Sequence, residues 1–420
     1  MNESTPLQQL KALLKSKSPL VVIAVGLRGV LSLAIYKLVS INFGVSGLGL
    51  FSHFQNFTSL FTQVSDQGTT LGIMSLHKEE QNRPRLFFHA FILNTVFFLL
   101  ISLIVYIKQD VFLRYFEGLS FSELNFALAG LSIFILLYNS LTFSFIYATR
   151  SFKLLLFLTI INIIVVFLFV WVSSQWGLTS TMYGFVFGWG LCSLINFSVA
   201  YFTQVMPKLE FSFSMDIVKS LGNFILIAGA GLLLGKFVDY FVRDFAFDWY
   251  GIENTGYWQS QVRLSDSYRS AFLGTLGLVF YSGISMQITN TIFLKEYTRK
   301  MMMYSVVIVL PALVGIYIFR NHLFILLYSR ELLPATDFLY WQLIADLFAL
   351  PSFLLVYVLI ARKNFKVYLK VHLVSALVYV VFILVFSLLS SEIWVIPAAN
   401  ALRYFLFFFL LFRLVKKDLK

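Results

Sequence analysis

The chain has 420 residues, of which 59% are hydrophobic and 12% are charged, and its formal net charge is +12. Soluble globular proteins carry about a quarter charged residues, so this composition excludes a soluble domain and indicates a polytopic membrane protein. A single cysteine, Cys192, excludes a disulfide within the chain and a cysteine-based metal site.

Apolar segments long enough to cross a bilayer recur along the whole chain. A spanning helix needs roughly 20 mostly apolar residues. The twelve predicted spans are 20–41, 47–74, 86–107, 121–147, 154–173, 179–203, 221–243, 256–283, 301–319, 338–361, 368–389 and 394–414. We therefore expect an all-α polytopic membrane protein. Prolines inside the ninth, tenth and twelfth spans, at positions 311, 351 and 397, predict helix kinks.

Lys and Arg residues divide unevenly between alternate connections. With the N-terminus inside, 21 of them fall in inside segments and 5 in outside segments. This positive-inside bias predicts that both termini are cytoplasmic. It also accounts for most of the net charge, so the basic balance does not indicate a nucleic-acid partner.

The two halves of the chain share a pattern. Residues 41–57 and 251–268 each carry a Gly-rich turn into a span with polar residues early. Six spans per half predict a parallel repeat related by an axis along the membrane normal. The predicted domains are a cytoplasmic amphipathic N-terminus at 1–19, an N-lobe of six spans at 20–203, a cytoplasmic inter-lobe linker at 204–220, a C-lobe of six spans at 221–414 and a cytoplasmic tail at 415–420.

Ten Lys, Arg and Asp residues fall inside predicted spans, away from the span ends. They are Arg28, Lys37, Lys236, Arg263, Arg269 and Arg403, with Asp66, Asp239, Asp266 and Asp346. One such group at membrane depth costs at least about 2.5 kcal/mol and is functional by default. The structural alternative is that the lysines reach an interface and that the acids pair with neighbouring cations. The excess of cations favours a cavity for an anion, because Arg binds phosphate or carboxylate through paired hydrogen bonds.

These charges define the candidate site. The predicted substrate-binding residues are Arg28, Lys37, Arg263, Arg269, Arg403, Trp258 and Gln259. The ion-coupling candidates are Asp66, Asp266 and Asp346, since an anion on a neighbouring Arg would shift a proton or Na⁺ on the acid. The alternative is that each acid only forms a salt bridge. Trp258 is interpreted as a stacking platform for sugars, or as part of the interfacial aromatic belt. No nucleotide, catalytic or metal-binding motif occurs, so we expect neither cofactor nor enzyme.

Three motifs resemble those of Wzx-type flippases, the O-antigen and lipid III translocases of the multidrug/oligosaccharidyl-lipid/polysaccharide exporter superfamily. They are the turn Gly44-x-x-Gly47-Leu48-Gly49-Leu50, the W-Q-x5-S-D-x-Y of Trp258, Gln259, Ser265, Asp266 and Tyr268, and the W-Q-L-x-x-D of Trp341, Gln342, Leu343 and Asp346. The resemblance covers essentially the whole chain. Arg263, Arg269 and Arg403 depart from the commonest pattern of the family.

The resemblance implies two six-helix lobes in a V that alternate between inward-open and outward-open states. Its implied substrate is an undecaprenyl-diphosphate-linked oligosaccharide, moved from the cytoplasmic to the periplasmic leaflet of the bacterial inner membrane. Membrane lipid, a polysaccharide polymerase and a chain-length regulator are the implied partners. Two alternatives stay open within this view: a multidrug/cation antiporter of the same superfamily, which would need an acidic cavity, and a flippase for the peptidoglycan precursor. A membrane polymerase or structural protein is the third.

Overall fold

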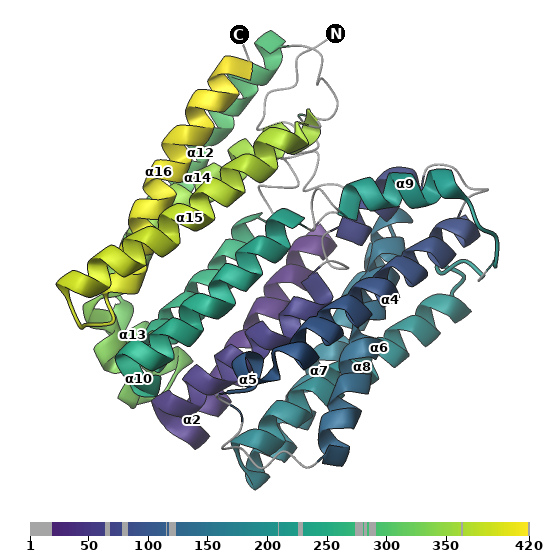
Figure 1. Cartoon of the computed structure of the whole chain (residues 1–420). Helices are drawn as coiled ribbons and strands as arrows, with labels where there is room; N and C mark the ends of the chain where they lie inside the picture. Colours follow the sequence, from purple (N-terminus) through teal and green to yellow (C-terminus); the bar gives the residue numbers. More distant parts are fainter. Residues whose placement is uncertain are drawn as a thin grey trace. The chain divides into compact units, whose positions relative to one another are not determined.

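The computed structural model describes residues 19–63, 68–77, 83–114, 116, 123–208, 210–225, 230–273, 280, 284, 291–362 and 364–418. Their regular structure is helical throughout (Figure 1). The elements are α2 (Pro19–Gln63), α3 (Thr70–Leu76), α4 (Arg83–Ile107), α5 (Gln109–Phe112), α6 (Glu123–Ala148), α7 (Phe152–Ser173), η3 (Ser174–Trp176), α8 (Leu178–Phe202), α9 (Met215–Phe224), α10 (Ala230–Phe272), α12 (Thr291–Ile318), α13 (Arg320–Leu327), η6 (Arg330–Asp337), α14 (Leu339–Ala361), α15 (Phe365–Leu389) and α16 (Val395–Asp418).

Nine helices in the described part of the chain are long and apolar enough to cross a membrane. One of them, Leu20–Thr62 within α2, has 43 residues. At 1.5 Å per residue it is about 65 Å long, twice the roughly 30 Å of a bilayer core, so it supplies two spans. Helix α10 also has 43 residues. It is less apolar than those nine helices because it carries many of the charges discussed below. Counting two spans in each long helix confirms the predicted all-α multi-pass membrane protein.

Both long helices break at a glycine. Gly44 has φ 65° and ψ −161°, and Gly251 has φ 82° and ψ 165°. A side chain is strained at such positive φ values, whereas glycine adopts them readily. These two residues therefore divide α2 and α10 into their successive spans, at the start of the Gly-rich turns seen in the sequence.

The three membrane prolines differ in position. Pro311 and Pro351 lie inside α12 and α14, as predicted. Pro397 does not kink a span, contrary to prediction, because it is the third residue of α16. The N–H groups of a first helical turn have no partner within the helix, so proline removes nothing there.

The chain folds into two compact units. Unit 1 contains the described residues up to Gly49 and those from Val242 onward, and unit 2 contains Leu50–Phe241. Each boundary falls within ten residues of a glycine break. The predicted lobes, 20–203 and 221–414, divide the chain at other positions. The first span lies in unit 1 with the later part of the chain, and the start of α10 lies in unit 2.

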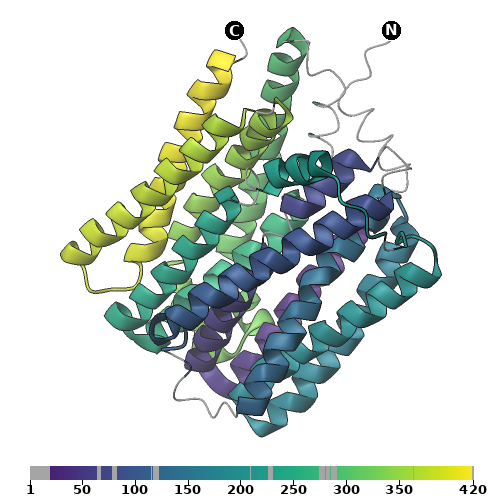
Figure 2. The ribbon, with the colours of Figure 1, turned by 45° about the vertical axis from the view of Figure 1, so that its right-hand side comes forward.

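Unit 1 is built on α14. This helix packs against α12 and α16, and α15 packs against α16 (Figures 1 and 2). Its face includes Ala345 and Ala349, both fully buried, with Leu354 one turn further along. Small residues spaced four apart allow the neighbouring backbones to approach closely. The hydrophobic core of this unit extends along α14 to Leu411 of α16.

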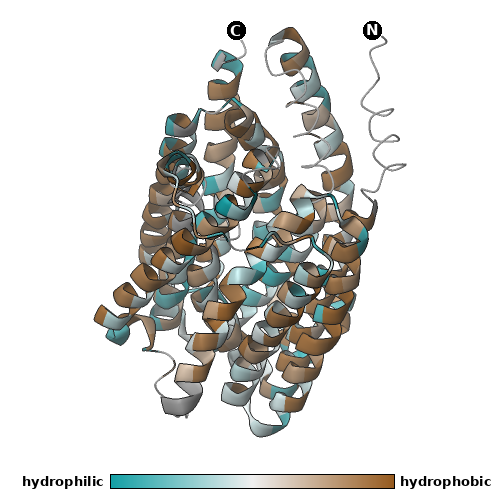
Figure 3. Cartoon of the chain, turned by 90° about the vertical axis from the view of Figure 1, so that its right-hand side faces the viewer, coloured by the Kyte–Doolittle hydropathy of each residue, from teal (hydrophilic) through white to brown (hydrophobic). Residues whose placement is uncertain are grey.

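Unit 2 contains the last part of α2, the helices α3–α9 and the first part of α10. Its core includes Ile73, Leu86, Phe145 and Leu221, each of which is at most 2% exposed. Helices α7 and α8 meet at Gly184, where an added Cβ would lie 2.0 Å from Ser173 Oγ. Hydrophobic residues cover long stretches of the helices (Figure 3), as expected for surfaces in contact with lipid.

Candidate functional site

Nine of the ten predicted site residues are described, and all nine lie in unit 1. Asp66 lies outside the described residues. The nine come from α2, α10, α14 and α16. Sequence positions more than 300 residues apart are therefore brought into one compact unit, although not all of them into one cluster.

Asp346 is the centre of a buried polar cluster. Its side chain is fully buried on α14. Oδ2 accepts hydrogen bonds from Ser265 Oγ, at 2.5 Å, and from the Tyr268 hydroxyl, both on α10. Gln342 Nε2, one turn before Asp346, lies 3.3 Å from Ser265 Oγ and 3.5 Å from both carboxylate oxygens. We call these residues, with Arg269 and Tyr404, the buried cluster.

Arg269 supplies the positive charge of the buried cluster. Its Nη1 lies 3.7 Å from Asp346 Oδ1, and its Nη2 donates to the Tyr404 hydroxyl at 3.3 Å. The guanidinium carbon is 5.3 Å from the ring centre of Phe353, which is within cation–π range. The ion pair is not bidentate, so Arg269 is held mainly by charge and by aromatic rings.

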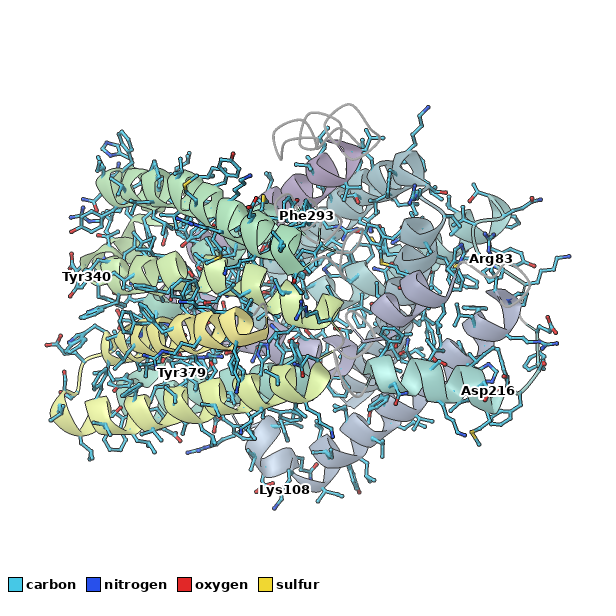
Figure 4. The ribbon with its side chains drawn as sticks, turned by 90° about the horizontal axis from the view of Figure 1, so that it is seen from above. Arg83, Lys108, Asp216, Phe293, Tyr340 and Tyr379 are labelled. Carbon is cyan, nitrogen blue, oxygen red and sulfur yellow. The ribbon has the colours of Figure 1, made fainter. Side chains whose placement is uncertain are left out.

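Arg403 joins the same region from α16. Its Nε donates to Ser375 Oγ at 2.9 Å. Its guanidinium lies over the rings of Tyr379, at 4.9 Å, and Tyr404, at 5.0 Å. Tyr379, labelled in Figure 4, is a residue of α15. Tyr404 therefore contacts both Arg269 and Arg403, and it links the two guanidinium groups.

Arg263 lies earlier on α10 than Arg269 and pairs with an acid on its own helix. Its Nη1 is 3.8 Å from Asp266 Oδ2, and its guanidinium lies 5.1 Å from the ring centre of Tyr36. The Asp266 side chain is 48% exposed. Arg28 is half-buried on α2, one residue before Gly29, which faces the Ser267 backbone of α10. Both cations thus lie where the first span packs on α10.

Trp258 and Gln259 are buried in the structure. Trp258 is 5% exposed, and Gln259 is fully buried. Gln259 Oε1 accepts a 2.8 Å hydrogen bond from Arg243 Nε. This bond joins the segments of α10 on either side of Gly251. The prediction that Trp258 and Gln259 bind substrate stays a prediction.

Lys37 binds the end of a helix. Its Nζ donates to the backbone oxygens of Ile325, at 2.7 Å, and Tyr328, at 2.8 Å. These residues end α13, where a cation stabilises the carbonyl end of the helix dipole. Tyr328 in turn donates its hydroxyl to Ser260 O at 2.9 Å. Burial raises the pKa of the Tyr328 hydroxyl, so it remains a donor at every physiological pH.

We expect Lys37→Gln to lower the stability of unit 1 by about 1–3 kcal/mol, because two charge-assisted bonds to carbonyls are lost. Thermal unfolding in detergent measures the effect. Lys295→Gln removes an exposed lysine on α12 and serves as the control, with no change expected. A Lys37→Gln protein of wild-type stability that fails in transport would instead assign Lys37 to the substrate.

Five residues that sequence reasoning did not place in the site bond to the predicted charges. They are Ser265, Tyr268, Gln342 and Tyr404 of the buried cluster, and Ser375, which bonds to Arg403. The first three belong to motifs noted in the sequence, and their polarity inside a span was a usable signal. Ser375 and Tyr404 gave no such signal, since single serines and tyrosines are common in membrane helices.

The chemistry of the buried cluster is that of a charged pair sheltered from water. Asp346 accepts bonds from hydroxyl and amide donors while facing one guanidinium, which compensates the cost of desolvating its charge. Among the described residues, no group of three His, Cys, Asp or Glu could hold a metal ion.

No family model matches the sequence, and no curated protein matches it. Solved structures do match over nearly the full length. An inward-facing multidrug resistance MATE family transporter of the MOP superfamily gives a TM-score of 0.73 at 15% identity, covering 96% of this chain and 99% of that one. The lipid II flippase MurJ, in an inward closed conformation, gives 0.73 at 16% identity and covers 95% of this chain and 89% of that one.

A third match is a MOP superfamily transporter from Pyrococcus furiosus, described as having a binding pocket of reverse polarity. Its TM-score is 0.70 at 17% identity, with 99% of this chain and 97% of that one covered. The chain therefore has the fold of these transporters.

Proposed function

We propose that the chain is a flippase that moves an undecaprenyl-diphosphate-linked oligosaccharide from the cytoplasmic to the periplasmic leaflet of the bacterial inner membrane by alternating access. The observation that carries the proposal is the charge of the membrane-embedded site in unit 1. Among the described residues of the site, three arginines, Arg263, Arg269 and Arg403, stand with two acids, Asp266 and Asp346, and this excess of positive charge supports an anionic substrate. The fold, shared with a lipid II flippase and with MATE transporters, supports transport.

A diphosphate suits this site for a physical reason. Its oxygens accept several hydrogen bonds at once, and guanidinium groups donate in pairs with matching geometry. Arg269 and Arg403 already share Tyr404, so one anion can approach both. The glycan is too polar to enter hydrocarbon, whereas the lipid tail remains in the bilayer during transport.

Asp346 is the proposed coupling group. In the structure it balances the charge of Arg269. A diphosphate that binds Arg269 replaces this balance, and the repulsion between the two anions favours uptake of a proton or Na⁺ by Asp346. Release of the substrate restores the pair. The binding of substrate and the binding of the coupling cation are thereby linked at one buried site.

The alternative is a multidrug/cation antiporter. The fold is equally compatible with this function, since the matched structures include MATE transporters. A cationic drug would have to bind beside Arg269 and Arg403, and like charges at this distance repel each other. The charge of the site therefore favours the flippase.

We expect Arg263→Gln to reduce flipping at least about tenfold, because a charge-assisted hydrogen bond contributes about 1.5–3 kcal/mol. Arg263 is the best single test, since its partner Asp266 is half exposed and tolerates the loss. The measurement uses proteoliposomes that contain a fluorescent undecaprenyl-diphosphate oligosaccharide. A reductant added to one side destroys the fluorophore in that leaflet, so the loss of fluorescence reports flipping. Complementation of a flippase-deficient strain gives a second readout.

Arg320→Gln is the matched control. Arg320 is half-buried at the start of α13, away from the residues of the candidate site in the sequence. It donates to Tyr317 O at 3.0 Å, and its guanidinium lies over the Tyr317 ring, three residues earlier at the end of α12. It should flip as wild type does. The proposal would be overturned in favour of the antiporter by two results together. The wild type would export a cationic dye but not flip the lipid, and Arg263→Gln would still export the dye.

A further inference from the structure

Unit 2 contains an aromatic cavity. Its volume is about 610 Å³, within the range of ligand pockets. The walls come from α2, α4, α6 and α8. Phe57 and Phe61 of α2 lie with ring centres 5.5 Å apart, and Phe61 lies 5.6 Å from Phe98 of α4. Phe116 closes the wall, 6.0 Å from Phe57.

Small residues on α6 leave the cavity its space. Ala129 and Gly130 both line it. A Cβ built on Gly130 meets no atom within 4 Å, so this position faces open volume rather than a packed neighbour. A cavity walled by phenylalanines offers water few hydrogen bonds, and such cavities bind apolar molecules instead.

The cavity lies against lipid-facing surface. One stripe of α4, with Phe98, Ser102 and Val105, faces the cavity. The residues between them point outward: Leu99 is 58% exposed and Leu103 is 53% exposed. At membrane depth, exposed leucines contact lipid chains, so hydrocarbon is the phase next to the cavity.

One end of the cavity is polar. Gln109 lines it there, just beyond the last residue of α4, and is exposed together with Lys108 and Asp110. Lys108, labelled in Figure 4, directly follows the last residue of α4. Lys and its amide and carboxylate neighbours at the end of a span mark the head-group region of a bilayer. The cavity thus has an aromatic body with a polar mouth at the level of head groups.

We propose that this cavity binds one acyl chain of a membrane phospholipid, with the phospholipid head group at the Lys108–Asp110 end. The volume, the apolar walls, the adjoining lipid-facing leucines and the polar mouth all match an amphiphile held by its tail. The bound chain fills the space beside Gly130 and holds α4 and α6 together. This proposal is independent of the transported substrate.

Photolabelling tests the proposal on the whole protein in lipid nanodiscs. The probe is a phosphatidylglycerol with a diazirine on its acyl chain, and the labelled peptides are read by mass spectrometry. We expect adducts on Phe57 and Phe61, which are only 6% and 7% exposed and so are reached only through the cavity. Gly130→Leu fills the cavity and should lower this labelling about tenfold. Labelling of Leu99 and Leu103 should not change.

Leu131→Phe is the matched control, since Leu131 is 54% exposed and adjoins Gly130 on α6. It should leave labelling of Phe57 and Phe61 unchanged. Ala129→Leu gives a second filling variant in case Gly130→Leu does not fold. Absence of adducts on Phe57 and Phe61, or adducts unaffected by a folded filling variant, would overturn the proposal. Labelling of these residues by a diazirine polyprenyl phosphate but not by the phospholipid would overturn it too.

Discussion

Replacing Asp346 with Asn should destabilise the protein by about 3–5 kcal/mol, because it leaves the Arg269 charge buried without its partner. Asn keeps the shape of the side chain and can still accept the bonds from Ser265 and Tyr268. The loss therefore reports the charge of the pair, which lies 3.7 Å apart, rather than a cavity. Thermal and urea unfolding in detergent, followed by size-exclusion chromatography, measures it.

A second substitution separates stability from transport. Arg269→Gln added to Asp346→Asn removes both charges, and most of the lost stability should return, since paired residues are strongly non-additive. Flipping should not return, because the double variant lacks both Arg269, the proposed binding residue for the diphosphate, and Asp346, the proposed coupling acid. An Asp346→Asn protein as stable as the wild type would show that Asp346 is not the charged partner of Arg269.

The sequence predicted the membrane helices well because hydrophobic length is a local property. It also indicated the two Gly-rich turns, although the residues with positive φ are Gly44 and Gly251, at or near their starts. The grouping of the first span with the later half of the chain was not predictable. It depends on which helix faces pack together, and apolar helices in lipid show weak amphipathic patterns.

The candidate site was predictable in kind but not in its pairings. Charges inside spans stand out, so the sequence singled out Arg269, Asp346 and Arg403, and the structure brings these three side chains close together. Spacing along one helix correctly offered Asp266 as a partner for Arg263. The partner of Arg269 is on α14, 77 positions away, and only tertiary packing reveals it. Likewise Lys37 binds the end of α13, and nothing in its own span points to that segment.

The contact between α2 and α10 leads to the other large expected effect. Gly49 and Gly256 face each other in unit 1: an added Cβ on Gly49 would lie 3.2 Å from Gly256 Cα. On Gly256 it would lie 2.2 Å from the Val45 backbone oxygen, closer than real Cβ contacts come. Because the obstacle is backbone, the helices must separate. We expect Gly256→Ala to cost about 1–3 kcal/mol, and Gly256→Leu to prevent folding.

Gly26→Ala provides the comparison on α2, since a Cβ there meets nothing within 4 Å. It should keep wild-type stability or gain up to about 1 kcal/mol from the better helix propensity of alanine. The amount of monodisperse protein and its melting temperature distinguish the variants. If Gly256→Ala melts like Gly26→Ala, the close approach of α2 and α10 is not required. The placement of Arg28 and Arg263, which depends on that approach, would then lose its support.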